Sequence, residues 1–417
     1  MKKRIVITGL GAVTPVGNDV PTTWEALVAG RSGIDSITRF DVSDMGVRVA
    51  AEVKGFDPAA LFGRRVARRN DRFTLFALEA ARQAIADAGL DLDNGVGQNT
   101  GVFIGTAIGG VTSFLANYDV LQESGPQRVS PFTVPMMMPN AASATVAIMH
   151  GLRGPNLCVA SACATGSHAI GEAAEVIRRG QAEVMLSGGS DAVIDRLALA
   201  AFKNMRVVST RNDDPQRASR PFDAERDGFV MGEGAGVLVL ESLDHARRRG
   251  AHIYAELVGY GATADAFHIT APEETGIGAI RAMREALQDA GLAPDTVDYI
   301  NAHGTSTLLN DRTETQAIRQ VFGSHADRLA ISSTKSMVGH LMGAAGAVEA
   351  IACVKSLETG WVHPTVNYEY PDPACDLDYV PNQARQLNPQ VVLSNSFGFG
   401  GHNGCLIFRR WEGEEAE

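Results

Sequence analysis

Cysteine is scarce in this chain, and long apolar runs are absent. The 417 residues include five cysteines, with no CxxC pair and no metal-ligand spacing, which argues against a zinc site and against a disulfide framework. No apolar run approaches the roughly 18 residues that a membrane-spanning helix requires. No apolar signal region follows residues 1–4 either. We therefore expect reduced thiols in a globular, cytoplasmic protein.

Positive charge is also in deficit. Lysine and arginine number 37 against 48 aspartates and glutamates, and the net charge is -11 at pH 7. Such a field repels nucleic acids and other acidic partners, so an acidic partner requires a local basic patch. One stretch offers such a patch, because residues 63–69 read GRRVARR and hold four arginines in six residues. The alternative for this charge run is a solvated face.

The length exceeds that of one ordinary core, and the sequence contains an internal repeat. Residues 77–90 (ALEAARQAIADAGL) match residues 279–292 (AIRAMREALQDAGL), and residues 163–180 match residues 343–360. The strand at 101–106 has its counterpart at 299–305. Three elements recur in one order, which favours duplication of an α/β unit over chance similarity of alanine-rich helices. We predict halves at 1–251 and 252–412, an acidic tail at 413–417, and close contact between helices 163–180 and 343–360.

Other elements follow from hydrophobic patterning. We predict a strand over 3–9 with a turn at Gly9-Leu10-Gly11, helices over 24–29 and 73–89, a loop or interface segment over 126–139, and buried strands within 182–188 and 228–240. The glycine turn resembles half of a dinucleotide-binding motif. It lacks the third glycine and an immediate helix, which argues against NAD binding.

One cysteine lies at the start of a predicted helix. Residues 159–166 read VASACATG, so Cys163 follows a cluster of very small residues. The free N–H groups and dipole of a helix start favour a thiolate, and neighbouring amides can form an oxyanion site. The alternative is a small buried cysteine in a packing helix.

Two histidines lie at element ends in the second half. His303 follows the strand at 297–302, and His340 precedes the helix that repeats the one after Cys163. Pseudo-symmetry places His340 close to the start of that partner helix. A lone histidine is usually structural, but glycine and hydroxyl residues flank both of these. We expect Cys163, His303 and His340 to converge on one cleft.

These segments resemble the β-ketoacyl synthases. The matching motifs are VASACATG, ASRPFDAERDGFVMGEGAGVLVLE at 218–241, NAHGTST around His303, STKSMVGHLMGAAGAVEA around His340 and NSFGFGG at 395–401. They stand in the family's order and cover nearly the whole chain. The resemblance implies a thiolase-like α/β fold with two pseudo-symmetric halves in five αβαβα layers.

The resemblance also implies an activity and partners. The reaction is decarboxylative condensation of acyl-carrier protein with malonyl-carrier protein, giving 3-oxoacyl-carrier protein, CO2 and free carrier protein in type II fatty acid elongation. The implied partners are acyl carrier protein and a second copy of the chain. No cofactor is implied, because the substrates carry their own phosphopantetheine.

Residue roles follow from the same resemblance. Cys163 accepts the acyl chain, while His303 and His340 donate hydrogen bonds to the enolate oxygen as neutral imidazoles, with Lys335 and Glu349 as a supporting charge pair. The N–H groups of Cys163 and Phe399 form the acyl oxyanion hole, and Phe399 gates the pocket between Gly398 and Gly400. The remaining implied residues bind substrate (Ile108, Phe202, Thr270, Thr305, Thr307), dock carrier protein (Arg64, Arg65, Arg68, Arg69, Arg128, Arg206) or surround a structural monovalent cation (Asn301, Ser394, Asn395).

Two positions depart from the family pattern, and several rival interpretations remain. Leu308 stands where proline is commoner, and His402 stands where threonine is commoner, adding a third histidine without an assigned role. A synthase I-like enzyme or a polyketide ketosynthase subunit stays open. A thiolase needs a second catalytic cysteine, and the only late candidate, Cys405, leads into an apolar strand. A type III synthase has asparagine in place of one histidine, and a non-catalytic chain-length partner lacks the nucleophile. A scaffolding protein is the last alternative.

Overall fold

The computed structural model describes residues 2–92 and 95–413. The predicted acidic tail at 413–417 lies outside this range apart from Gly413. Within the described residues, no helix is both long and apolar enough to cross a membrane.

A mixed ten-stranded sheet runs through the molecule in the order β10-β9-β13-β14-β8-β1-β7-β6-β4-β5. Its strands are β1 (Ile5–Val13), β4 (Thr100–Gly105), β5 (Asn156–Leu157), β6 (Val184–Asp191), β7 (Gly234–Ser242), β8 (Ala255–Ala264), β9 (Tyr299–Asn301), β10 (Ala330–Ser332), β13 (Val391–Gly398) and β14 (His402–Arg410). Two short pairs stand apart, β2 (Asp35–Ser36) with β3 (Val49–Ala50) and β11 (Trp361–Val362) with β12 (Arg385–Gln386).

The sheet consists of two halves with the same strand order. Counted outward from the seam, the first half runs β1, β7, β6, β4, β5 and the second half runs β8, β14, β13, β9, β10. In both halves these are the first, fifth, fourth, second and third strands along the chain. The halves join where β1 and β8 pair antiparallel. This shared order is the duplication that the repeat predicts.

The α-helices are α1 (Val20–Val28), α2 (Pro58–Phe62), α3 (Arg64–Ala67), α4 (Arg72–Asp87), α5 (Val111–Ser124), α6 (Thr133–Met137), α7 (Ala141–His150), α8 (Thr165–Arg178), α9 (Arg196–Asn204), α10 (Leu243–Arg248), α11 (Ile277–Ala290), α12 (Leu308–Phe322), α13 (Lys335–Val338) and α14 (Ala345–Thr359). Short 3₁₀ turns are η1 (Val96–Asn99), η2 (Pro126–Arg128), η3 (Ala162–Ala164), η4 (Pro215–Arg217), η5 (Pro294–Thr296), η6 (Gly323–Arg328) and η7 (Met342–Ala344). The segment at 126–139, predicted as a loop, thus contains η2 and α6.

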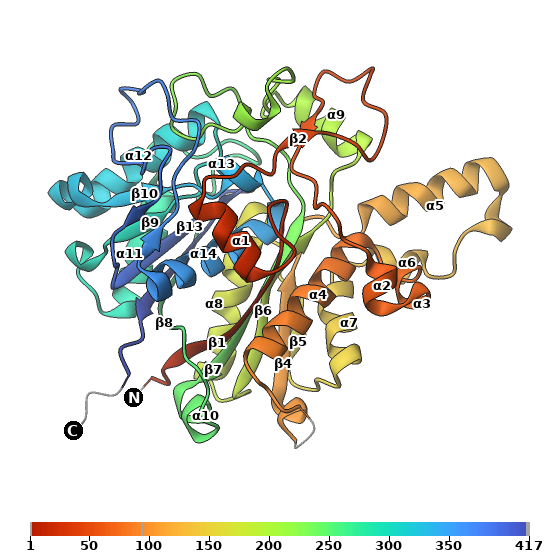
Figure 1. Ribbon diagram of the computed structural model, residues 1–417, viewed down its shortest axis with the longest axis horizontal. Helices are drawn as coiled ribbons and strands as arrows, with labels where there is room; N and C mark the ends of the chain where they lie inside the picture. Colours follow the sequence, from red (N-terminus) through yellow and green to blue (C-terminus); the bar gives the residue numbers. More distant parts are fainter. Residues whose placement is uncertain (1, 93–94, 414–417) are drawn as a thin grey trace.

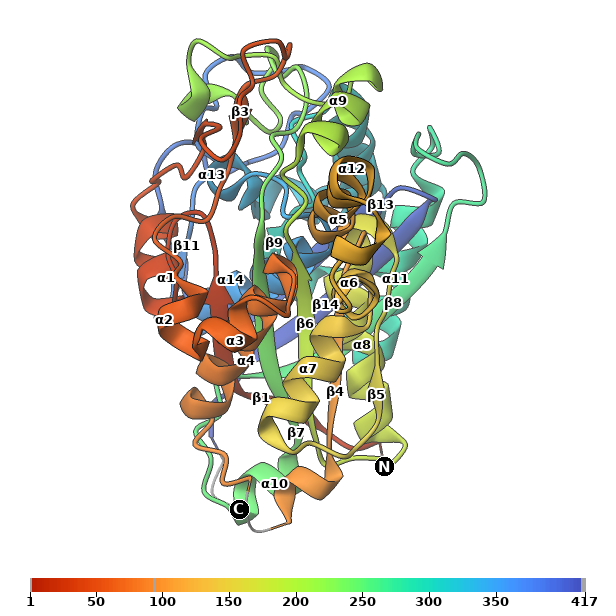
Figure 2. The same ribbon diagram turned by 90° about the vertical axis from the view of Figure 1, so that its right-hand side faces the viewer.

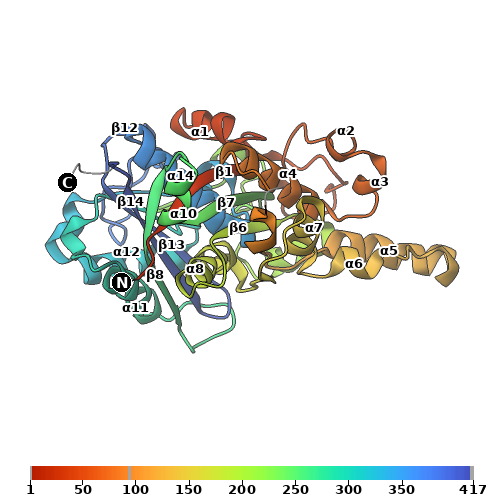
Figure 3. The same cartoon turned by 90° about the horizontal axis from the view of Figure 1, so that it is seen from below.

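Helices form three layers around the two sheet halves. Helices α8 and α14 contact strands of both halves, whereas α4 and α7 pack on the first half. Helix α11 packs on the second half, and α12 lies against α11 and shares its hydrophobic core. Figure 1 shows the sheet and its helices, and Figure 2 gives the same elements from the side. Figure 3 shows α11 and α12 at one end of the molecule and α4 and α7 toward the other, where α5 projects. The five-layered αβαβα architecture is confirmed.

The two central helices touch through glycine. A Cβ atom at Gly166 of α8 would lie 2.7 Å from the amide nitrogen of Ala347, and one at Gly346 of α14 would lie 2.8 Å from that of Ser167. Only glycine leaves room for backbones at this separation. The predicted close approach is confirmed, and it brings the two helix starts to the centre of the molecule.

The predicted turn at Gly9-Leu10-Gly11 is wrong, because β1 continues through it to Val13. A Cβ atom at Gly9 would lie 2.2 Å from the carbonyl oxygen of Ala84, and one at Gly11 would lie 1.9 Å from that of Ala80. Both carbonyls belong to α4. These glycines therefore let a helix pack closely on a buried strand.

Candidate active site

A single cavity between the halves gathers the predicted catalytic residues. Its volume is about 420 Å³. Its wall includes Cys163, His303 and His340. It also includes most of the predicted substrate and gate residues, namely Ile108, Phe202, Thr270, Thr305, Thr307, Gly398 and Phe399. The predicted convergence on one cleft is confirmed.

Cys163 lies in η3, directly before α8. The preceding Ala162 has a positive φ of 50°, an uncommon conformation for a residue with a side chain. Burial raises the pKa of the Cys163 thiol to about 11, although the backbone N–H of Phe399 and the charge of Lys335 both lower it. Burial of Cys163 therefore opposes the stabilisation of a thiolate that a helix start provides. Desolvation outweighs the helix start, and the resting group is a thiol.

Alkylation of Cys163 by iodoacetamide is expected to accelerate about tenfold per pH unit between about pH 7 and pH 9, because only the thiolate reacts. Peptide mass spectrometry of quenched time points measures the rate at Cys163 separately from that at Cys158. A rate that levels off below about pH 8 would show that the helix start stabilises the thiolate after all.

His340 presents a free N–H to the cavity. Its Nδ1 accepts a hydrogen bond from the Met342 N–H at 3.1 Å, so the ring proton of the neutral form is on Nε2. Among the described residues, the buried Nε2 has no hydrogen-bond partner. Burial, followed by the charge of Lys335, lowers the pKa of His340 well below 6.5. The ring is thus a neutral donor.

His303 is arranged in the same way. The ammonium group of Lys335 donates to its Nδ1 at 3.3 Å, which again leaves the proton on Nε2. Burial, Lys335 and His340 together lower the pKa of His303 well below 6.5. The two rings meet edge to face with centroids 5.5 Å apart. The predicted neutrality of both imidazoles is thus supported by their surroundings.

Lys335 and Glu349 form a buried ion pair. Their side chains are 1% and 2% exposed, so this is not the solvated pair of a helix face. Burial raises the pKa of Glu349, and Lys335 opposes that rise. The ion pair places the ammonium group of Lys335 against Nδ1 of His303, and the carboxylate of Glu349 offsets its buried positive charge.

Glu314 of α12 is a site residue that sequence reasoning missed. Its carboxylate accepts the N–H groups of His303 at 2.9 Å and Gly304 at 2.8 Å, and burial raises its pKa to about 7. It fixes the backbone that carries His303. The available signal is spacing, because Asp311 and Glu314 lie three residues apart on the face of α12 that buries Ala317 and Ile318.

Asp191 at the end of β6 was also missed. Its Oδ2 accepts the N–H groups of Ala107 at 2.9 Å and Gly343 at 2.7 Å, and burial raises its pKa to about 6. It therefore ties the loop before Ile108 to η7, the turn directly before α14, joining the two halves beside the cavity.

The predicted gate follows β13. A Cβ atom at Gly398 would lie 2.7 Å from the Ser161 carbonyl oxygen, so glycine lets this loop pass against the Cys163 turn. Gly400 has φ +84° and donates its N–H to the Ile269 carbonyl oxygen at 2.7 Å. His402 is half-buried outside the cavity wall, with its ring 6.4 Å from that of His168.

The predicted docking arginines fall into separate groups. Arg64, Arg65, Arg68 and Arg69 line a cleft with residues 130–132, and the Arg69 guanidinium lies 4.5 Å from the centre of the Phe132 ring. Arg206 instead lines the central cavity. Arg128 lines neither one.

Buried oxygens without partners occur on all three residues of the predicted cation site and on Glu349. They are Asn301 Oδ1, Ser394 Oγ, Asn395 Oδ1 and Glu349 Oε2, which have no hydrogen-bond partner among the described residues. Asn301 and Ser394 are direct neighbours across β9 and β13. The described residues contain no group of three or more histidine, cysteine, aspartate or glutamate side chains arranged for a metal. This oxygen set fits a monovalent cation better than a transition metal.

Sequence comparisons cover nearly the whole chain. The model described as "Beta-ketoacyl synthase, N-terminal domain" matches residues 2–246, and "Beta-ketoacyl synthase, C-terminal domain" matches residues 254–369. Curated relatives named 3-oxoacyl-(acyl-carrier-protein) synthase 2 include one from Synechocystis sp., 53% identical over 411 residues and 99% of both chains. Another from Staphylococcus aureus is 51% identical over 98% of this chain and 99% of its own.

Solved structures share the fold. A β-ketoacyl synthase from Burkholderia phymatum has a TM-score of 0.92 and 41% identity, covering 98% of this chain and 100% of its own. A type II PKS ketosynthase, in complex with its acyl-carrier protein and bound to the hexaketide, has a TM-score of 0.90 at 36% identity, covering 99% and 100%.

Proposed function

The chain belongs to the β-ketoacyl synthase family, and on that premise we propose that it condenses acyl-carrier protein with malonyl-carrier protein, releasing CO2 and forming 3-oxoacyl-carrier protein in fatty acid elongation. One observation carries the proposal. A buried cysteine shares a cavity with two neutral imidazoles whose Nδ1 atoms already accept hydrogen bonds. The elongation role is favoured over polyketide synthesis because the full-length relatives at 51–53% identity are named 3-oxoacyl-(acyl-carrier-protein) synthase 2.

The first step transfers the acyl chain to Cys163. Sγ attacks the thioester carbonyl, the bond from that carbonyl to the phosphopantetheine sulfur breaks, and the thiol proton ends on the departing sulfur. The N–H groups of Cys163 and Phe399, both near the thiol, would stabilise the oxyanion. Because the resting group is a thiol, proton removal must accompany attack.

The second step decarboxylates the malonyl group. Its C–CO2 bond breaks, and the electron pair forms an enolate whose oxygen accepts hydrogen bonds from Nε2 of His303 and of His340. The enolate carbon then attacks the acyl thioester, the bond to Sγ breaks, and Cys163 recovers a proton from solvent. Neutral donors suit this step because they stabilise the enolate without protonating it.

A condensation assay tests the proposed function. Malonyl-carrier protein and acyl-carrier proteins of graded chain length are mixed with the enzyme, and products are resolved by mass. We expect 3-oxoacyl-carrier protein and one CO2 per product from at least one chain length. Failure to form it from any of them would contradict the proposal.

Carrier protein docking is proposed at the arginine cleft, on the premise that the carrier protein is acidic. Arg65→Glu combined with Arg68→Glu is expected to raise the Michaelis constant for carrier-protein substrates about tenfold or more, because it reverses charge at the contact. The effect should shrink as salt is added. Arg281→Glu with Arg284→Glu on the exposed face of α11 makes the same charge change elsewhere. An equal rise in both double variants would place docking elsewhere.

We also propose a homodimer formed through the face around β5. This strand ends the sheet, and Leu157 on it is 60% exposed beside Ile148 of α7, which is 79% exposed. An uncovered apolar face next to an edge strand invites a second copy of the chain. Light scattering is expected to give twice the chain mass, and Ile148→Glu with Leu157→Glu should lower it to that of one chain. A wild-type mass of one chain would contradict the dimer.

Two further assignments remain proposals. The unpartnered oxygens at Asn301, Ser394 and Asn395 would hold a monovalent cation that stabilises the strands behind the histidines, with no part in bond making. The reaction needs no cofactor beyond the phosphopantetheine of its substrates. All five cysteines are free thiols, which supports a cytoplasmic location.

A further inference from the structure

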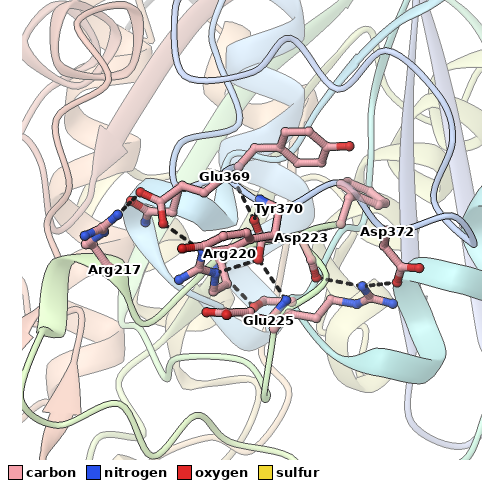
Figure 4. A network of polar contacts seen from close by, with 12 residues as sticks. Arg217, Arg220, Asp223, Glu225, Glu369, Tyr370 and Asp372 are labelled. Carbon is pink, nitrogen blue, oxygen red and sulfur yellow. Dashed lines mark hydrogen bonds and ion pairs between the residues drawn. The ribbon is translucent and has the colours of Figure 1, made fainter.

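The segment at 218–228 contains a buried arginine that the proposed reaction does not use. The Arg226 side chain is 2% exposed, although it carries a full charge. Figure 4 shows the polar network around this segment, which joins it to residues 369–372. A buried guanidinium is costly unless its donors are matched, so its partners indicate its purpose.

Arg226 binds the backbone of the segment that carries His303. Its Nε donates to the Thr307 carbonyl oxygen at 3.3 Å, and its Nη2 donates to that of Leu308 at 3.2 Å. Its charge is balanced by Asp372 at 2.6 Å and by the fully buried Asp311 at 3.5 Å. The planar guanidinium holds two neighbouring carbonyls in a fixed fork, a geometry that the point-like ammonium of a lysine does not impose.

Neighbours of Arg226 hold the middle of the same segment. The Arg220 N–H donates to Ser306 Oγ, and the Gly228 N–H donates to the Ser306 carbonyl oxygen, both at 3.0 Å. Ser306 has a φ of +69°, which a serine keeps only when its surroundings impose it. Residues 220–228 therefore fix the backbone of residues 306–308.

Residues 220–228, which hold residues 306–308, are themselves anchored. Arg220 donates to Asp223 at 2.9 Å, and Asp223 accepts the N–H groups of Glu369 and Tyr370, each at 2.7 Å. Figure 4 shows these contacts converging on Asp223. Because Nη1 of Arg226 also donates to the Asp223 carbonyl oxygen at 2.7 Å, the arginine has little freedom to move.

The clamped segment supplies polar groups to the cavity. Thr305 and Thr307 both line it, and their hydroxyl oxygens are 2.9 Å apart. The positions of both hydroxyl groups depend on the backbone at 305–308. Arg226 holds this backbone at its C-terminal end, through the carbonyl oxygens of Thr307 and Leu308. We propose that Arg226 is a positioning residue that sets this hydroxyl pair for the amides of the substrate's pantetheine arm. This inference rests on the proposed function.

The test compares two malonyl thioesters, one on pantetheine and one on ethanethiol, which has no amides. CO2 release is measured for each with wild-type enzyme and with Arg226→Lys, which keeps the charge but loses the fork. We expect the Michaelis constant for malonyl-pantetheine to rise about tenfold, the size of one or two lost neutral hydrogen bonds. The rate with malonyl-ethanethiol should stay unchanged. The preference for the pantetheine thioester over the ethanethiol thioester should therefore fall by the same factor of about ten.

Asp372→Asn is the matched control, because it removes a charge partner of Arg226 and leaves both carbonyl contacts. It should keep the wild-type preference. A preference that persists in Arg226→Lys, or an equal loss with both thioesters, would overturn the inference. Should Arg226→Lys fail to fold, Arg226→Gln, which can donate to one carbonyl, gives the same comparison. No CO2 from wild-type enzyme with either thioester would instead contradict the proposed function.

Discussion

Replacing His340 by alanine is expected to slow decarboxylation of malonyl-carrier protein by about 10²–10³-fold, the usual cost of losing one oxyanion donor. The variant removes a buried Nε2–H that faces the cavity and has no partner among the described residues. The same loss is expected for His303→Ala, because its Nε2–H serves the same oxygen. Release of labelled CO2 measures the effect.

Acyl transfer to Cys163 should survive in both variants, because its oxyanion faces backbone N–H groups instead. His252→Ala is the control, since that exposed ring lies outside the cavity and packs edge to face on Tyr254. Unchanged CO2 release in either His303→Ala or His340→Ala would remove that histidine from the site.

The pH dependence of decarboxylation follows from the same two rings. Burial keeps the pKa values of His303 and His340 well below 6.5, so both remain neutral as the pH falls from about 8 to about 6. Protonation at lower pH would displace the donors that now reach Nδ1. The rate should therefore stay flat over this range, whereas a fall with a midpoint near 6.5 would indicate an ordinary, solvated histidine.

Replacing Cys163 by alanine is expected to abolish condensation, by at least about 10⁴-fold, because no acyl-enzyme can form. Decarboxylation of malonyl-carrier protein should persist, since both imidazole donors remain. This separation distinguishes a lost nucleophile from a damaged fold. Cys158→Ala is the control, because Cys158 is half-buried and does not line the cavity. Condensation by Cys163→Ala would refute the assignment of the nucleophile.

Much of the site can be predicted from sequence because it lies at element ends that the duplication relates. The helix after Cys163 and its copy after His340 share glycines, and those glycines permit close contact between the two helices. Once the helices touch, Cys163 and His340 must be near each other. His303 then follows from its place at the end of β9 in the same half.

What sequence reasoning misses depends on desolvation and on backbone direction. The helix start at Cys163 is visible in the sequence, but the burial that raises its pKa to about 11 arises only when the halves close over it. Glu314 serves backbone N–H groups 10 and 11 residues earlier, which no motif encodes. Gly9 and Gly11 resemble a turn because the helix that crowds them lies about 70 residues away.

The unpartnered oxygens show that side-chain orientation also cannot be predicted from the sequence. The asparagine at 301 can be read from the sequence, but not which way its amide points. In the structure, its Nδ2 donates to Thr334 at 2.8 Å, and its buried Oδ1 has no hydrogen-bond partner among the described residues. Such orientation follows from the packed neighbours alone.

The most direct test of the account is the intact mass of the protein during one catalytic cycle. Incubation with acyl-carrier protein should add the mass of one acyl group per chain, located on Cys163 by peptide mapping. Addition of malonyl-carrier protein should return the chain to its original mass as 3-oxoacyl-carrier protein appears. A chain that gains no acyl group, or that gains one equally as Cys163→Ala, would contradict the account.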